Sequence, residues 1–189
     1  MKLSKIISGG QTGADRVALD WAIKHNVPHG GWCPKGRKAE DGSISPVYQL
    51  TETPSDDYLE RNEWNVRDSD GTVIFTIRCE LSDGSKRTAD FAEQHRKPWL
   101  HLSENSEGGD AEIRLKRFIE DNNIKVLNVA GSRASQEPRL LAFVPAVLSA
   151  ALFNTPFVMP EGLRDSEERE PSDTSAEHKP SRRSRSQRR

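Results

Sequence analysis

The chain has 189 residues, of which 28 are Lys or Arg and 29 are Asp or Glu, which gives a formal net charge of −1. This balance excludes a uniformly basic protein of the kind that binds nucleic acid non-specifically. The sequence contains no apolar run long enough to cross a membrane and no signal peptide, and its two cysteines, Cys33 and Cys79, form no C-x-x-C pair. We therefore expect a cytoplasmic protein with reduced thiols and no membrane contact.

The length and the composition predict one folded domain over residues 1–157 and a charged tail over residues 158–189. The tail is rich in Ser, Glu, Pro and Arg and has almost no apolar residues. Such a segment buries too little surface to offset its ordering entropy, so we expect it to be disordered. Its Arg-rich end predicts at most a weak electrostatic contact with nucleic acid, and a solvated tail with no partner is an equal alternative.

The first element is a strand over residues 3–8, and an amphipathic helix over 14–25 follows it directly. A strand that enters a helix through Gly9, Gly10 and Gly13 leaves backbone N–H groups bare at the positive end of the helix, which suits phosphate. The spacing matches neither G-x-G-x-x-G nor the P-loop. In the alternative interpretation, the glycines only supply unusual backbone angles.

After this helix the sequence predicts one long connection and then a regular alternation of helices and strands. Residues 26–31 break the first helix, and segment 32–54 is long enough to be a functional loop or to contain short strands. A helix over 56–68, with Ser55 as its N-cap, and a buried strand over 71–77 follow. The later elements are a turn over 82–85, a helix capped by Thr88 and ending near residue 96, a strand over 98–102, a helix over 110–122, a strand over 125–129, a loop over 131–138 and a helix over 139–153.

This alternation predicts an α/β fold with a mostly parallel sheet that helices cover on both faces. In such folds the ligand lies beyond the carboxyl ends of the strands. Segments 9–15, 82–85 and 131–138 each follow a strand, so we expect them to line one rim. Their convergence favours phosphate binding over a purely structural glycine turn.

The long connection carries most of the charged candidate residues. Lys35 and Arg37 suit an anionic ligand, and a guanidinium can hold phosphate with two donors. Glu40 and Asp41 are candidates for a general base or for an acceptor of ribose hydroxyls. An ordinary solvated cluster of charges is the alternative.

Two further groups of residues share a spacing that suggests a site. Arg61 and Asn65 lie four residues apart on one helix, so both can face the same ligand, although Arg61 could instead form a surface ion pair. The steps of four between His25, His29 and Cys33 suggest a metal site. We reject it because the segment breaks the helix and lacks a fourth ligand.

Four ordered blocks resemble the putative molybdenum carrier family, a circularly permuted branch of the SLOG superfamily. They are residues 8–16 (SGGQTGADR), 30–42 (GGWCPKGRKAEDG), 61–72 (RNEWNVRDSDGT) and 127–133 (LNVAGSR). The resemblance extends over about residues 4–155. It implies a Rossmann-like three-layer α/β/α sandwich that binds a nucleotide or a nucleotide-derived ligand. The related phosphoribohydrolases carry a Pro-Gly-Gly-x-Gly-Thr-x-x-Glu signature that this sequence lacks.

We therefore expect the protein to bind a nucleotide or a nucleotide-derived phosphorylated small molecule. Carriage of molybdenum cofactor, itself a phosphorylated pterin, and hydrolysis of an N-glycosidic or phosphoester bond are the alternatives, and a homo-oligomer stays open. Glu40 and Asp41 are the candidate catalytic residues, and no metal ligands are expected. The candidate ligand-binding residues are Gly9, Gly10, Gln11, Thr12, Gly13, Asp15, Lys35, Arg37, Arg61, Asn65, Gly131, Ser132 and Arg133.

Overall fold

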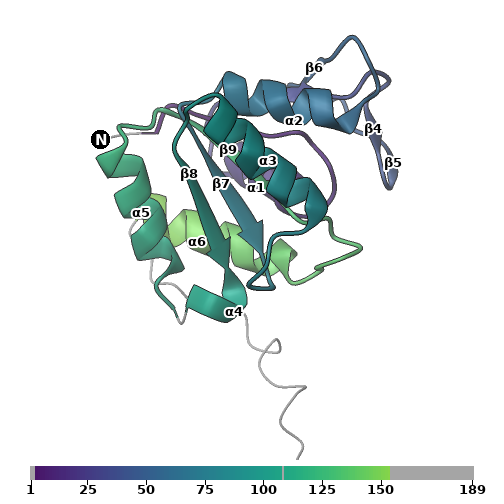
Figure 1. Cartoon of the computed structure of the whole chain (residues 1–189). Helices are drawn as coiled ribbons and strands as arrows, with labels where there is room; N and C mark the ends of the chain where they lie inside the picture. Colours follow the sequence, from purple (N-terminus) through teal and green to yellow (C-terminus); the bar gives the residue numbers. More distant parts are fainter. Residues whose placement is uncertain (1–2, 108, 154–189) are drawn as a thin grey trace, which may run out of the picture.

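The computed structural model describes residues 3–107 and 109–153, which form a central sheet between two layers of helices (Figure 1). The sheet has the order β2-β1-β9-β7-β8, and every pair of neighbouring strands is parallel. Its strands are β1 (Lys5–Ile7), β2 (His29–Gly30), β7 (Gly71–Thr76), β8 (Trp99–Ser103) and β9 (Val126–Gly131). The predicted mostly parallel α/β fold is therefore confirmed.

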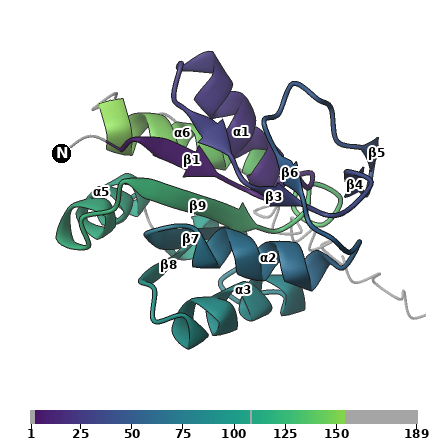
Figure 2. The same cartoon turned by 90° about the horizontal axis from the view of Figure 1, so that it is seen from above.

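The helices divide between the two faces of the sheet, as the view from above shows (Figure 2). On one face lie α1 (Ala14–Lys24), α5 (Ala111–Asp121) and α6 (Leu140–Phe153), and on the other lie α2 (Tyr58–Arg67) and α3 (Asp83–Gln94). The short α4 (Glu104–Glu107) follows β8. The chain runs from β1 to β2 in one direction along the sheet and from β7 to β8 in the other. Right-handed crossovers therefore put α1 and α3 on opposite faces.

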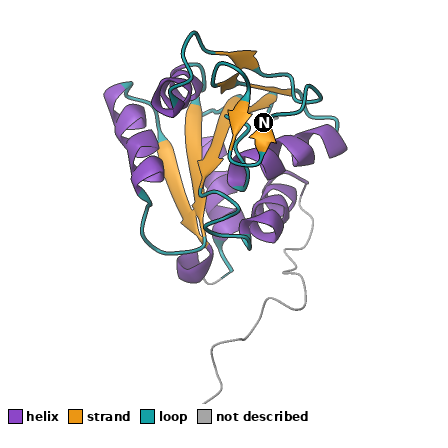
Figure 3. Cartoon of the chain, turned by 90° about the vertical axis from the view of Figure 1, so that its right-hand side faces the viewer, coloured by secondary structure: helices purple, strands orange, loops and turns teal. Residues whose placement is uncertain are grey.

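The main apolar core fills the space between the sheet and α1, α5 and α6. It combines strand residues such as Ile6, Phe75 and Leu127 with helix residues such as Leu115 and Phe143. This face buries the large apolar side chains, so hydrophobic burial fixes the register of the sheet on it. Figure 3 shows the strands enclosed by helices on either side.

The connection over residues 32–54 contains four short strands. This confirms the second of its two predicted interpretations, a segment that contains short strands. The four strands are β3 (Trp32–Cys33), β4 (Lys38–Ala39), β5 (Gly42–Ser43) and β6 (Thr51–Glu52). β3 pairs with β6 in parallel and β4 pairs with β5 in an antiparallel hairpin. A small separate cluster of Leu19, Cys33, Ile44 and Tyr48 anchors this segment to α1.

Two predicted helix starts are wrong. α3 begins at Asp83 and has Ser82 as its N-cap residue, whereas Thr88 lies inside the helix and donates its hydroxyl to the carbonyl of Gly84 at 3.2 Å. The cap of α2 is Asp57, whose carboxylate accepts the N–H of Leu59 at 2.8 Å, rather than Ser55. A Ser or Thr inside a helix can bond back to the preceding turn, so its presence alone does not mark a start.

Residues 29–30 were expected to be part of a break, but they form the edge strand β2 beside β1. The predicted tail over residues 158–189 lies outside the described residues. So does the proposed boundary at residue 157.

Candidate functional site

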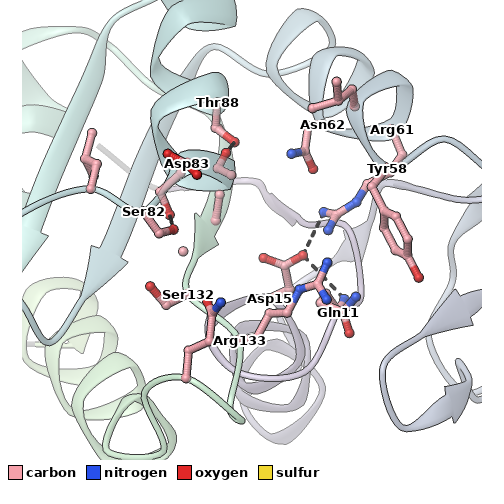
Figure 4. Close-up of a pocket in the computed structure, with 17 residues that line it drawn as sticks. Gln11, Asp15, Tyr58, Arg61, Asn62, Ser82, Asp83, Thr88, Ser132 and Arg133 are labelled. Atoms are coloured by element: carbon pink, nitrogen blue, oxygen red, sulfur yellow. Dashed lines mark hydrogen bonds and ion pairs between the residues drawn. The ribbon is translucent and has the colours of Figure 1, made fainter.

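A pocket of about 690 Å³ opens at the carboxyl ends of β1, β9 and β7 (Figure 4). The strand order changes direction across these three strands, which is where parallel α/β sheets bind ligands. The pocket draws its lining from the segments after all three strands and from the first turns of α2. Its residues are Gln11, Asp15, Tyr58, Leu59, Arg61, Asn62, Leu81, Ser82, Asp83, Gly84, Ser85, Thr88, Ala130, Gly131, Ser132, Arg133 and Gln136.

The expected common rim is therefore present, but three amides of the glycine turn donate to acceptors within the protein. The N–H of Gln11 donates to Asp15 Oδ2 at 3.4 Å, and the N–H of Thr12 donates to Gln11 Oε1 at 3.0 Å. The N–H of Ala14 donates to the carbonyl of Ser132 at 3.2 Å. These three amides already have acceptors in the protein, so they are not the bare phosphate donors that the glycine spacing predicts.

The glycines themselves allow two close approaches. Gly13 has φ +82°, and a Cβ there would lie 2.3 Å from the carbonyl oxygen of Ser132. A Cβ on Gly9 would lie 1.6 Å from Nη1 of Arg61. Gly13 thus lets the turn pack on the segment after β9, and Gly9 lets a guanidinium lie against the turn.

Arg61 and Asp15 form a buried ion pair at this point. Arg61 Nη1 lies 2.8 Å from Asp15 Oδ2, and the residues are 8% and 3% exposed, respectively. Burial raises the pKa of the Asp15 carboxyl, while Arg61 and the N–H of Gln11 oppose the rise. Both Arg61 and Asp15 line the pocket, which places this charged pair on its wall.

Gln11 is held in one orientation and leaves one donor unused. Its Oε1 accepts the N–H groups of Thr12 at 3.0 Å and Glu40 at 2.9 Å, which fixes the amide so that Nε2 points the other way. Among the described residues, Gln11 Nε2 and Arg61 Nε are buried and have no hydrogen-bond partner. Buried donors of this kind are costly, and both belong to residues that line the pocket.

The opposite wall of the pocket is the start of α3. Figure 4 shows Ser82, Asp83 and Thr88 on one side of the cavity, across from Gln11, Asp15 and Arg61. The first N–H groups of a helix have no acceptor within it, and the Ser82 side chain makes no capping hydrogen bond here. The wall therefore offers backbone donors and hydroxyl groups at the positive end of a helix dipole.

Arg133 completes the pocket with a second cation. Its guanidinium carbon lies 5.4 Å from the centre of the Tyr58 ring, and both residues line the cavity and are partly exposed. An Arg that is stacked on a ring keeps its planar donors available for an oxyanion. Arg133 is thus a predicted residue that the structure does place at the site, as are Gly131 and Ser132.

Most of the charged candidates from the long connection lie outside the pocket. Arg37 donates to four backbone carbonyls within its own segment, those of Ile44, Ser45, Tyr48 and Leu50, at 2.8–3.1 Å. Lys35 is exposed and does not line the cavity. Asn65 is buried and joins β3 to α2 through the N–H and carbonyl of Trp32, both at 2.9 Å. These contacts make Arg37 and Asn65 structural residues.

The two candidate bases are also engaged elsewhere. Glu40 accepts the hydroxyls of Thr12 and Ser135, the latter at 2.7 Å, which ties the connection to the segment after β9. Partial burial acts in the opposite direction, but these hydroxyl donors lower the pKa of Glu40 below its usual value. Asp41 pairs with Arg16 at 3.0 Å, and this contact lowers the pKa of Asp41. Neither carboxylate lines the pocket.

Sequence reasoning did not select the residues of the two helix starts that line the pocket. They are Tyr58, Asn62, Ser82, Ser85 and Thr88. The turn over residues 82–85 was expected at the rim, and the sequence predicts a helix capped by Thr88, whereas α3 begins at Asp83. A Ser-Asp-Gly-Ser turn directly after a buried strand is the signal that could have identified the start of α3 as a wall of the site.

Neither a metal centre nor a membrane segment is found in the described part of the chain. Residues 3–107 and 109–153 contain no group of three or more His, Cys, Asp or Glu side chains that could hold a metal ion. None of their helices is long and apolar enough to cross a bilayer.

The parallel sheet, its two helical layers and the pocket at the carboxyl ends define a Rossmann-like three-layer protein. A profile of the Circularly permutated YpsA SLOG family matches residues 6–152. The chain belongs to this family, and the resemblance seen in its sequence is confirmed.

The chain is also similar to a solved structure, the crystal structure of "Putative molybdenum carrier protein" from Syntrophus aciditrophicus SB. The two chains are 48% identical, with a TM-score of 0.77, over 79% of this chain and 95% of that one. A comparison with curated proteins found no match.

Proposed function

We propose that the protein binds a nucleotide or a nucleotide-derived phosphorylated small molecule in the pocket at the carboxyl ends of β1, β9 and β7. The observation that carries this proposal is the polar lining of the cavity, in which the open first turn of α3 and the Arg133 guanidinium accompany the buried pair of Asp15 and Arg61. Membership of a SLOG family supports the same conclusion.

In this proposal the phosphate of the ligand binds to the wall of the pocket that the start of α3 and Arg133 form. The glycine turn is a poor place for it, because residues 9, 10, 12 and 13 do not line the pocket and the Asp15 carboxylate lies beside the turn. The opposite wall offers open helix amides, the hydroxyls of Ser82 and Ser85, and the Arg133 guanidinium. Asp83 is the acidic side chain on this wall, at a position where the helix dipole favours a carboxylate.

Molybdenum cofactor is the second candidate ligand, because the solved relative at 48% identity is named a putative molybdenum carrier protein. The described residues contain no cluster of His, Cys, Asp or Glu side chains for a bare metal cation, so molybdenum would bind as an oxyanion or within an organic molecule. The α3 wall and Arg133 fit the phosphate of such a molecule. Hydrolysis is not proposed, because Glu40 and Asp41 lie outside the pocket.

Native mass spectrometry of the full-length protein as purified tests for a bound small molecule. Calorimetric titration with AMP, GMP, neopterin phosphate and inorganic phosphate then separates nucleotide from pterin. Arg133→Ala should weaken binding of the best probe by about tenfold or more, since a charge-assisted hydrogen bond contributes about 1.5–3 kcal/mol.

The matched control is Arg117→Ala, which removes an exposed Arg on α5, outside the pocket. It should leave affinity unchanged. If both variants weaken binding equally, the loss of affinity in Arg133→Ala reflects the overall charge of the protein and not a contact in the pocket. Failure of every phosphate-bearing probe to bind would contradict the proposal.

A further inference from the structure

We propose that a second, smaller cavity beside the pocket is a subsite for a sugar, so that the ligand is a nucleoside diphosphate whose distal phosphate carries a sugar. This inference rests on the proposed function, and it adds a binding site for groups that a mononucleotide lacks. Three observations lead to it: the place of the second cavity, the cation in each of the two cavities, and the hydrogen-bonding groups that line the smaller one.

The second cavity has a volume of about 370 Å³ and lies beside the start of α3. Four residues line both this cavity and the pocket of about 690 Å³, namely Leu81, Ser82, Ser132 and Gln136. Figure 4 shows Ser82 and Ser132 on the side of the pocket away from Arg61. A ligand whose phosphate binds at the start of α3 can therefore continue into either cavity.

The hydroxyl of Ser132 is a free polar group at this junction. Ser132 is 5% exposed, and its N–H and carbonyl bond the backbone of Phe75 and Ala14, both at 3.2 Å, which fixes its main chain. Within the described residues its hydroxyl makes no hydrogen bond, and the oxygen keeps accessible surface. A phosphate at the junction of the two cavities would accept this hydroxyl together with the amides at the start of α3.

Each of the two cavities has one guanidinium in its lining. Arg133 lines the pocket, and Arg78, two residues after β7, lines the second cavity. Arg78 is exposed, and in the described part of the chain its guanidinium makes no ion pair or hydrogen bond. A single phosphate beside Arg133 leaves Arg78 without an anion. A diphosphate at the junction supplies one phosphate for each guanidinium.

The other polar side chains of the second cavity favour a sugar beyond the diphosphate. Glu80 and Gln136 are exposed and line this cavity, and carboxylate and amide oxygens accept hydroxyl groups. A carboxylate repels phosphate, so Glu80 suits the sugar end of the ligand. Among the described residues no aromatic side chain lines the second cavity, so a second base would find no ring to stack on.

Glu137 holds the wall of the second cavity in place. It is 8% exposed, and its two carboxylate oxygens accept the N–H groups of Ile77 at 2.9 Å and Arg78 at 3.1 Å. These contacts join the segment after β7 to the loop after β9, so the main chain that leads to Glu80 has a fixed position. The two backbone donors also offset part of the repulsion between this carboxylate and a phosphate.

The test extends three mononucleotides group by group. Calorimetry of the full-length protein would compare AMP, ADP and ADP-glucose, then GMP, GDP and GDP-mannose, then UMP, UDP and UDP-glucose. In at least one series we expect the diphosphate to bind about tenfold more tightly than the monophosphate, and the sugar compound about tenfold more tightly again, because each adds a charge-assisted hydrogen bond.

The possible outcomes separate this inference from the proposed function. If mononucleotides bind and no sugar compound binds more tightly than its diphosphate, the inference is overturned and the proposed function stands. Tighter binding of NAD than of any sugar compound would put a second base in the cavity and would also overturn the inference. If no phosphate-bearing compound binds, the proposed function fails together with it.

Two exposed substitutions distinguish the distal phosphate from the sugar. Arg78→Ala should weaken the diphosphate and the sugar compound by about tenfold and leave the monophosphate unchanged. Glu80→Ala should weaken the sugar compound alone. Arg117→Ala and Glu93→Ala, exposed changes outside both cavities, are the matched controls and should alter none of the affinities. An unchanged affinity for the sugar compound in Glu80→Ala and Arg78→Ala would contradict the subsite.

Discussion

The connection from Trp32 to Glu52 and the pocket wall around Asp15 both contain charged residues, yet they differ in what those charges contact. In the connection, Arg37 is fully engaged by backbone carbonyls, and Asp41 and Glu40 pair with α1 and with neighbouring hydroxyls. On the pocket wall, buried donors and a carboxylate oxygen stay unmatched. A dense run of charges thus builds a stable loop, whereas the pocket wall keeps buried polar atoms without hydrogen-bond partners among the described residues, as Glu104, Glu112 and Arg139 do outside the pocket.

The strongest test of this contrast is the buried ion pair. Arg61→Ala leaves the Asp15 carboxylate buried without its partner, and removal of one member of such a pair costs about 3–5 kcal/mol. Urea unfolding should show that loss in the free energy of unfolding. Asp41→Asn, which breaks the exposed pair with Arg16, should change it by less than about 1 kcal/mol. Similar losses of unfolding free energy in the two variants would contradict the difference between the buried pair and the exposed pair.

Arg37 should matter for stability and not for the ligand. Arg37→Ala leaves four carbonyls without their donors, and we expect a loss of about 2–4 kcal/mol in the free energy of unfolding. Titration with a nucleotide that binds the natural chain should give an unchanged affinity for the folded variant. A large loss of affinity with normal stability would place Arg37 in the site after all.

Glu40→Gln should have the smallest effect. Glu40 is exposed and accepts hydroxyls that an amide oxygen can also accept, so we expect at most about 1 kcal/mol of lost stability. Nucleotide affinity should be unchanged, because Glu40 does not line the pocket. A clear loss of affinity, measured by calorimetry, would restore the ligand role that the sequence suggested for this residue.

The fold was predictable because its elements carry strong local patterns. The apolar run of β7 and the periodic helices α1 and α5 agree with prediction to within one or two residues, since burial alone determines them. The start of α3 was missed by several residues. Thr88 resembles a cap in the sequence, and only tertiary packing shows that the helix begins earlier, at Asp83.

The candidate site was predictable in its location and much less in its chemistry. The rule that ligands lie beyond the carboxyl ends of parallel strands brought segments 9–15, 82–85 and 131–138 together. The sequence could not show that Asp15 and Gln11 accept the N–H groups of Gln11 and Thr12, nor that Arg37 turns toward the backbone of its own segment. Those outcomes depend on side-chain directions that residue type and spacing leave open.

The most direct test of the central claim is amide hydrogen exchange of the full-length protein, measured with and without a saturating ribonucleotide such as GMP or AMP. The first-turn amides of α3 lack acceptors within the helix and should exchange rapidly until a phosphate protects them. We predict slower exchange over residues 82–88 and 131–133 and no change over residues 35–43. Protection of residues 35–43 with none at the start of α3 would contradict the account.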